Sequence, residues 1–113
     1  MDRIKKYETA ILDFLKVYAK EMYDADPSDI ETLVVADKEN YHYQLVRVGW
    51  AEKRQVHYTP IHIDIKNNKV WIQINNTEEL VADELVNRGL SKQEIVLAFH
   101  PKELREFTGF AVA

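Results

Sequence analysis

The stretch from Pro60 to Asn76 restricts the fold most strongly, because it is typical of a β-hairpin. Apolar residues alternate with polar ones in two runs of the sequence, which hold Ile61, Ile63 and Ile65 and then Val70, Ile72 and Ile74. Asn67 and Asn68 stand between the runs, and asparagine accepts the positive φ angles of a two-residue type I′ turn. Such a turn fixes the register of the strands. It predicts buried pairs of Ile65 with Val70, Ile63 with Ile72 and Ile61 with Ile74, and pairs on the other face of Asp64 with Trp71 and His62 with Gln73.

The rest of the chain predicts one helix before the strands and further helices after them. Apolar residues recur at helical spacing over 2–23, with Asp2 as N-cap. Further strands are expected at 33–36, 41–50 and 55–65. The unbroken apolar run at 33–36 is typical of a strand covered on both faces, and Pro60 predicts an edge position or a bulge. A second helix is expected over 76–88, ending before Gly89, and a short one over 101–106. The run at 95–99 fits a helix or a fifth strand.

We therefore expect one α+β domain over residues 1–113, with an antiparallel meander of four or five strands, a long N-terminal helix and a second helix after the hairpin. The chain has no cysteine, which excludes disulfides and zinc–thiolate sites and fits a reducing cytoplasm. It shows neither an apolar signal core nor a run long enough to span a bilayer, so we expect a cytoplasmic protein that does not bind membranes. Its net charge of -4 argues against direct DNA binding as the main activity.

One face of the predicted sheet combines apolar and ionisable side chains. Extending the hairpin register through the preceding strand places Val56 and Tyr58 beside His62 and Asp64, with Leu45 and Arg47 as neighbours. Aromatic residues and arginine are enriched at the centre of protein interfaces. The candidate interface residues are Arg47, Tyr58, His62, Asp64, Trp71 and Gln73. The alternative is that a helix covers this face and that His62 and Asp64 are satisfied internally.

The sequence predicts no catalytic, cofactor-binding or metal-binding site. His62 and Asp64 could form a metal or acid–base pair, but a metal site needs three or four ligands, and His42, His57 and His100 show no supporting spacing. Asp64-Ile65-Lys66 matches the end of a restriction-nuclease motif, for which Asp37 is the one candidate second carboxylate. The C-terminal segment 107–113 is expected to pack on its own core, with a docking strand for another subunit as the alternative.

Several motifs together resemble the XisI family, the fdxN element excision controlling factors found chiefly in cyanobacteria. These motifs are Gly49-Trp50, His62–Ile65, Lys69–Gln73, Glu78-Glu79, Glu84–Val86, Gly89, Ile95–His100 and Thr108–Ala113. The resemblance implies an accessory protein that acts with a XisH-type partner while a separate site-specific recombinase excises a DNA element during heterocyst development. It implies no catalytic residues, and XisH itself resembles a restriction-type nuclease.

The leading hypothesis is thus a non-enzymatic controlling factor that binds a XisH-type protein, forms a homodimer and meets DNA at most through its partners. Two alternatives are a metal-dependent nuclease that uses Asp37, Asp64 and Lys66, and a protein that binds DNA directly.

Overall fold

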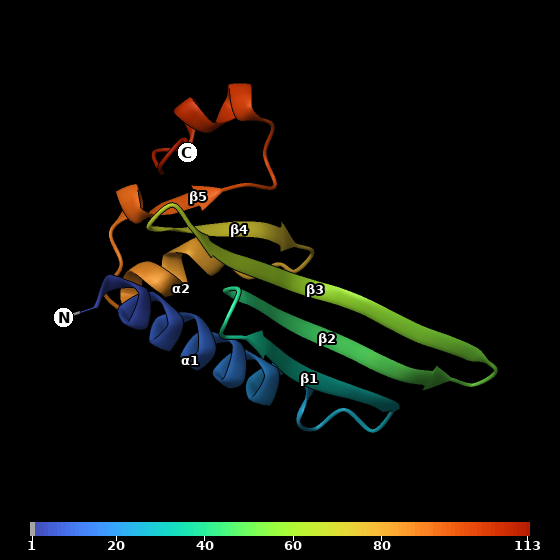
Figure 1. Ribbon diagram of the computed structural model, residues 1–113. Coiled ribbons are helices and arrows are strands. Elements are labelled where there is room, and N and C mark those ends of the chain that lie inside the picture. Colours follow the sequence, from blue (N-terminus) through green and yellow to red (C-terminus); the bar gives the residue numbers. More distant parts are fainter. Residues whose placement is uncertain (1) are drawn as a thin grey trace.

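A computed structural model describes residues 2–113 and shows a mixed five-stranded sheet with helices on one side (Figure 1). The strands lie in the order β1-β2-β3-β4-β5. The first four are antiparallel neighbours, and β5 runs parallel to β4. Along the chain the elements are α1 (Arg3–Tyr23), β1 (Asp29–Asp37), β2 (His42–Ala51), β3 (Arg54–Lys66), β4 (Lys69–Asn75), α2 (Val81–Asn87), β5 (Ile95–Leu97) and two 3₁₀ turns, η1 (Lys92–Glu94) and η2 (Lys102–Phe107).

The N-terminal helix begins and ends as the sequence predicts. Asp2 accepts a hydrogen bond from the amide of Ile4, which satisfies one of the free N–H groups at the helix start. The second helix is shorter than predicted and begins at Val81. Asn75 and Thr77 explain the delay, because their side chains bind nearby backbone groups and hold 75–79 in a turn. Gly89 ends this helix with a φ of 104°, as expected for a C′ glycine.

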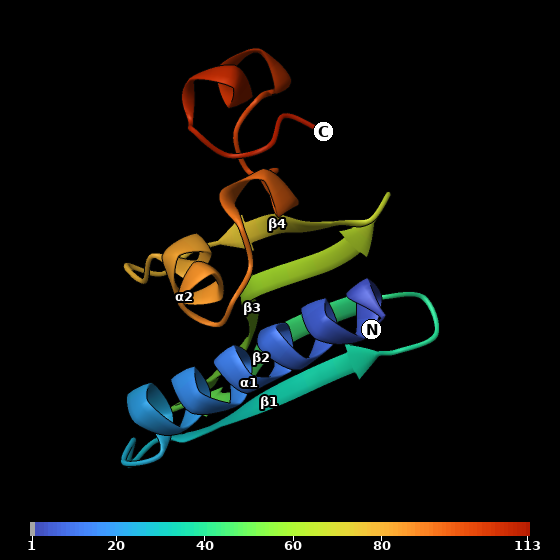
Figure 2. The same ribbon diagram turned by 90° about the vertical axis from the view of Figure 1, so that its left-hand side faces the viewer.

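Both helices cover the same face of the sheet (Figure 2). The core between them holds the buried side of α1, the inward residues of the sheet and one side of α2. Its largest fully buried side chains include Tyr7, Tyr43, Ile11, Leu15, Leu45, Ile61, Ile63 and Ile72. We call the opposite side of the sheet the outer face. Over β1 to β3 no helix of residues 2–113 packs against the outer face. None of the described helices is both long and apolar enough to cross a membrane.

The central hairpin forms with the predicted turn, but the predicted register fails at its open end. Asn67 and Asn68 have φ angles of 54° and 59°, and Ile65 pairs with Val70 and Ile63 with Ile72. Asp64 also lies opposite Trp71. Beyond this point a register shift places His62 opposite Ile74 and Ile61 opposite Asn75, so the predicted partners of Ile61 and His62 were wrong. Gln73 is the extra residue on β4 at this bulge.

A second bulge changes which residues share a face. Leu45 pairs with Ile61, but Arg47 pairs with Tyr58, so β3 carries one extra residue at Thr59 and Pro60. The bulge predicted at Pro60 is therefore confirmed. The bulge also shifts the alternation of side chains between the two faces, and the prediction did not include this shift. Tyr58 and Val56 lie on the helix face with Leu45 and Arg47, whereas His62 and Asp64 lie on the outer face. The predicted mixed face combined residues from both sides of the sheet.

The first strand is covered on one face only, against the prediction from its apolar run. β1 is an edge strand, and its neighbour on the sheet is β2. Thr32, Val34 and Ala36 point with Leu45 and Tyr43 toward α1, whereas Leu33 and Val35 lie on the outer face and are 39% and 44% exposed. Two large apolar side chains thus face water on a strand whose sequence is typical of full burial.

The C-terminal part of the chain packs on the far edge of the sheet. The ambiguous run at 95–99 forms the fifth strand, and the predicted short helix appears as η2. Ala111 bridges to Val96, and Trp71, Val96 and Ala111 form a small second hydrophobic cluster. The expectation that this segment packs on its own core is therefore confirmed.

Candidate functional site

The six predicted interface residues are divided between the two faces of the sheet. Arg47 lies on the helix side, where it is only 5% exposed. Its guanidinium lies 4.0 Å from the ring centre of Tyr23 and donates hydrogen bonds of 2.7 Å to Asp26 and to Thr32. The hydrogen bond from Arg47 lowers the pKa of Asp26 to about 2. Arg47 therefore joins α1, the following loop and β1, and it is held away from the outer face.

Trp71 is also enclosed by its own chain. It is 7% exposed, and its indole N–H donates to the carbonyl of Lys66 at 2.9 Å. The Lys66 ammonium lies 4.1 Å from the ring centre, and the Arg105 guanidinium lies 5.6 Å from it. Tyr58 is 47% exposed on the helix side. Gln73 is half-buried and is the extra residue of the β4 bulge. His62 and Asp64 lie on the outer face of β3, which the helices leave uncovered.

An apolar patch occupies the outer face of β1 and β2. It consists of Leu33, Val35, Val46, Val48 and Trp50, which alternate with inward residues on the two strands. Val46 lies opposite Leu33 and is only 8% exposed, whereas Leu33, Val35 and Trp50 are 39%, 44% and 53% exposed, with Trp50 at the end of the patch. A sheet with one face in water normally presents polar side chains on that face. These residues instead have the character of a surface that another molecule covers.

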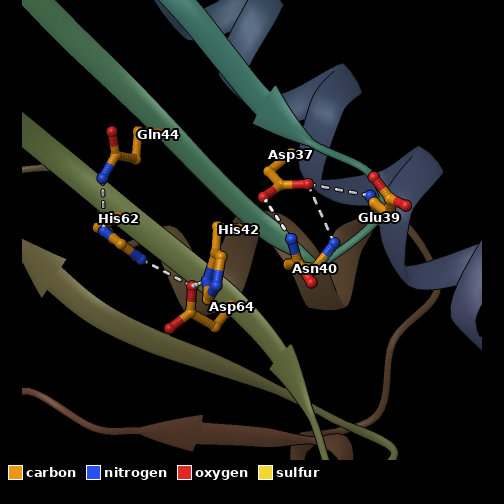
Figure 3. A network of polar contacts seen from close by, with 7 residues as sticks. All are labelled: Asp37, Glu39, Asn40, His42, Gln44, His62 and Asp64. Atoms are coloured by element: carbon orange, nitrogen blue, oxygen red, sulfur yellow. Dashed lines mark hydrogen bonds and ion pairs between the residues drawn. The ribbon is translucent and has the colours of Figure 1, made fainter.

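Next to the apolar patch, two histidines converge on one carboxylate (Figure 3). His42 begins β2 directly opposite Asp64 on β3, and Gln44 lies directly opposite His62. His42 Nδ1 and His62 Nε2 each lie 2.7 Å from the same oxygen, Asp64 Oδ1. We call His42, His62 and Asp64 the histidine cluster. Cross-strand pairing on two central strands fixes its geometry, so no loop has to position it.

The hydrogen bonds indicate which ring nitrogens of the two histidines carry a proton. A carboxylate only accepts, so both imidazoles donate an N–H to Asp64. Gln44 Nε2 lies 2.9 Å from His62 Nδ1 and donates to it when His62 is neutral. The hydrogen bond and the negative charge of Asp64, with a further contribution from Asp37, raise the pKa of His42. His42 is 53% exposed at its side chain, compared with 21% for His62 and 16% for Asp64.

The sequence spacing missed His42 because it reaches Asp64 across the sheet. His62 and Asp64 are two residues apart on one strand, whereas His42 lies on the neighbouring strand. The number of residues between His42 and Asp64 in the β2–β3 hairpin is the sequence signal that could have revealed this contact. The two-residue turn at Glu52 and Lys53 fixes the pairing of β2 with β3, but the bulge must be counted to bring His42 opposite Asp64.

The three residues of the nuclease hypothesis have separate partners. Asp37 ends β1 and accepts hydrogen bonds from the amides of Glu39 and Asn40 and from the Asn40 side chain (Figure 3). The Asn40 backbone hydrogen bond leads the interactions that lower the pKa of Asp37. Lys66 lies over Trp71, and Asp64 binds the histidines. Within residues 2–113, the group of histidine and acidic side chains arranged closely enough to hold a metal ion is the histidine cluster, and Asp37 lies outside it.

A family model of the XisI protein matches residues 1–112. The chain belongs to the XisI family. A comparison with curated proteins finds no match. The matched region contains the hairpin, the histidine cluster and the C-terminal segment, so the family pattern extends over the whole fold described above.

Two crystal structures from Anabaena variabilis ATCC 29413 share the fold of this XisI family member. A XisI-like protein is 34% identical, with a TM-score of 0.90 over 97% of this chain and 99% of the other. The fdxN element excision controlling factor XisI is 27% identical, with a TM-score of 0.86 over 99% of this chain and 100% of the other. The resemblance inferred from the motifs is thereby confirmed.

The Gly49-Trp50 motif now has a physical basis. Gly49 pairs with Ile30, and a Cβ at Gly49 would lie 2.2 Å from the backbone oxygen of Asp29, so the two strands approach too closely for a side chain. Trp50 is the next residue on β2, and it supplies the largest side chain of the apolar patch.

Proposed function

We propose that this XisI family member is a non-enzymatic controlling factor of DNA excision that acts by binding a XisH-type protein. It works in the cytoplasm as a homodimer, and a separate recombinase carries out the DNA chemistry. The apolar patch of Leu33, Val35, Val46, Val48 and Trp50 is the surface that the XisH-type partner covers.

The observation that carries this proposal is the apolar outer face of β1 and β2. Fully burying an apolar side chain of this size contributes roughly 1.5 to 3 kcal/mol, yet the described chain leaves Leu33, Val35 and Trp50 between 39% and 53% exposed. Trp50 stands at the rim as a large rigid side chain, and tryptophan is enriched among the residues that dominate binding energy. A protein partner gives these side chains the burial that α1 and α2 give to the other face.

The charge of the chain supports contact with DNA through partners. Its 15 basic and 19 acidic residues give a net charge of -4. Direct binding to the phosphate backbone requires a basic surface that displaces condensed counterions. The exposed patch is apolar, and its neighbours Glu31 and Asp37 are acidic, so this surface fits a protein better than a nucleic acid.

Light scattering after size exclusion tests the proposal on the tag-free chain alone and mixed with the XisH-type protein of the same genome. We expect the mass of a dimer for the chain alone and a stable complex in the mixture. Trp50→Ala should weaken the complex by about 30-fold or more, which corresponds to about 2 kcal/mol for a tryptophan that dominates binding energy. Leu33→Glu should abolish it. Phe107→Ala is the matched control, because Phe107 is the most exposed apolar residue and lies on η2, away from the patch.

The outcomes separate the parts of the proposal. Unchanged partner binding by both patch variants would refute the apolar patch as the docking surface. Loss of the homodimer in Leu33→Glu with partner binding intact would show that the patch joins two copies of this chain. No complex in the mixture at micromolar concentration would refute the XisH-type partner itself.

A further inference from the structure

We infer that the histidine cluster is a binding site for a divalent transition metal ion, with Zn²⁺ as the expected occupant. The ligand atoms are His42 Nδ1, His62 Nε2 and one oxygen of Asp64. This inference is independent of the proposed partner, since it depends on the side chains of β2 and β3 alone.

The first support is the convergence of the three ligand atoms. All lie within 4.8 Å of one another, and each nitrogen is 2.7 Å from Asp64 Oδ1. The two ring planes are inclined at 66°, so the imidazoles approach the carboxylate from different directions (Figure 3). Tetrahedral zinc with bonds of about 2.0 to 2.1 Å separates its ligands by about 3.3 Å. Side-chain rotations that widen the two 2.7 Å contacts by about 0.6 Å therefore create the required space.

The second support is the direction of the two imidazole N–H groups. Both point at the same oxygen, so two protons lie where a single cation would bridge the three groups. On binding, a neutral imidazole moves its proton to the opposite ring nitrogen, and an imidazolium releases the proton that faces Asp64 to solvent; in each case the freed lone pair forms a bond to the metal. No oxidation or other covalent step is involved.

The third support is the outer contact of His62. A metal-bound histidine usually fixes its other nitrogen with a hydrogen bond to a neighbouring group. Gln44 occupies this position at 2.9 Å from His62 Nδ1, and it lies directly opposite His62 on the adjacent strand. With the metal on Nε2, the proton of His62 moves to Nδ1, and the Gln44 amide turns its oxygen toward that nitrogen.

The donor set selects the class of ion. Two imidazoles and one carboxylate suit zinc and the neighbouring transition metals, whereas magnesium and calcium require oxygen ligands. Asp64 and Asp37 supply negative charge on this side of the sheet, and Asp37 acts on His42 electrostatically. The 53% exposure of His42 leaves the cluster open to solvent. An ion bound there has three protein ligands and an open position that faces outward.

Calorimetry with ZnCl₂ tests the inference on the tag-free protein at mildly alkaline pH, above the ordinary pKa of histidine. We expect one Zn²⁺ per chain with micromolar or tighter affinity. When cobalt replaces zinc, we expect visible absorption bands of Co²⁺ in a four- or five-coordinate protein site. The bound ion should raise the melting temperature, and EDTA should reverse this rise.

Four variants define the residues involved. His42→Ala and Asp64→Asn should lose saturable binding, and Gln44→Ala should weaken it by about 10-fold or more. His57→Ala is the matched control, because His57 lies on the same face of β3 beside Val48 and outside the cluster. His42 is exposed, so its replacement leaves the core intact, and circular dichroism checks the fold of each variant.

Absence of saturable Zn²⁺ binding by the parent protein would overturn the inference. Parent-like affinity in His42→Ala, or an equal loss in His57→Ala, would do the same. Loss of partner binding in the patch variants leaves this result untouched, so the two proposals fail separately.

Discussion

Gly49→Ala offers a sharp test of how the first two strands are joined. The added Cβ would lie 2.2 Å from the Asp29 carbonyl oxygen and 2.8 Å from Ile30 Cα. Carbon atoms in normal contact are about 3.5 to 4.0 Å apart. Both obstacles are backbone atoms, so no change of rotamer relieves the overlap, and the start of β1 must move away from β2.

The expected cost follows from that movement. Overpacking in a well-packed region costs about 1 to 3 kcal/mol, and weakening one or two ladder hydrogen bonds adds about 1 kcal/mol for each. We expect the free energy of unfolding to fall by about 2 to 5 kcal/mol. At about 4 °C per kcal/mol for a domain of this size, the melting temperature falls by about 8 to 20 °C.

Urea denaturation and differential scanning calorimetry measure the change directly. Glu31→Ala is the matched control, because Glu31 is exposed on β1 opposite Val48 and its replacement should stay within about 0.5 kcal/mol of the parent. A Gly49→Ala protein as stable as that control would refute the argument that close approach of the strands requires glycine at this position.

Three further predictions concern the core and its polar links. Ile63→Ala should destabilise the protein by about 2 to 5 kcal/mol through cavity formation at a fully buried position, measured by urea denaturation with the exposed Val112→Ala as control. Tyr7→Phe should cost about 1.5 to 3 kcal/mol, because the hydroxyl donates to Glu94 at 2.6 Å and approaches the Asn68 carbonyl at 3.0 Å; a loss no larger than that of exposed Tyr41→Phe would contradict it. Backbone hydrogen bonding from Ser91, followed by the Tyr7 hydroxyl, lowers the pKa of Glu94 below its ordinary 4.5. Its contribution to stability is therefore complete above about pH 4.5 and lost as pH falls through the folded-state pKa. Glu94→Gln should remove this part of the acid dependence, and an unchanged profile of stability against pH would count against the prediction.

The features predicted correctly from the sequence depend on residues that are close along the chain. Asn67 and Asn68 specify their own turn, and this fixes the nearest pairs of Ile65 with Val70 and Ile63 with Ile72. The apolar spacing of α1 and its cap at Asp2 are likewise local. The family resemblance followed from motifs spread over the fold, and the match to residues 1–112 confirms it.

The features that the sequence left unresolved depend on counting residues across a bulge. The prediction located the irregularity at Pro60 but kept the strict alternation through it, which moved Tyr58 to the face of His62. The same alternation, applied to the preceding strand, placed Arg47 on the outer face, whereas its guanidinium lies between Tyr23 and Asp26 on the helix side. His42 was set aside as a ligand because Asp64, its partner across the sheet, is 22 residues away in the sequence.

The apolar run of β1 shows a different limit. Such a run predicts burial on two faces, and the monomer buries one. Sequence patterns record all the burial that a strand experiences, including burial by other molecules, and they do not distinguish the source. The difference between pattern and monomer is what directs attention to Leu33 and Val35.

The extra residue of β3 has a consequence for how the length of this ribbon can vary. Removing Thr59 alone would pair Val46 with Pro60 and keep Arg47 opposite Tyr58, so every side chain would retain its side while the bend and added twist of the bulge disappeared. Removing Thr59 together with Pro60 would exchange the two faces of β3 from Arg54 to Tyr58 and place Tyr58 opposite Val46 on the outer face. A change of one residue at this point therefore alters the curvature of the outer face without altering its composition, and natural or engineered variants that differ by one residue here should differ in shape before they differ in chemistry.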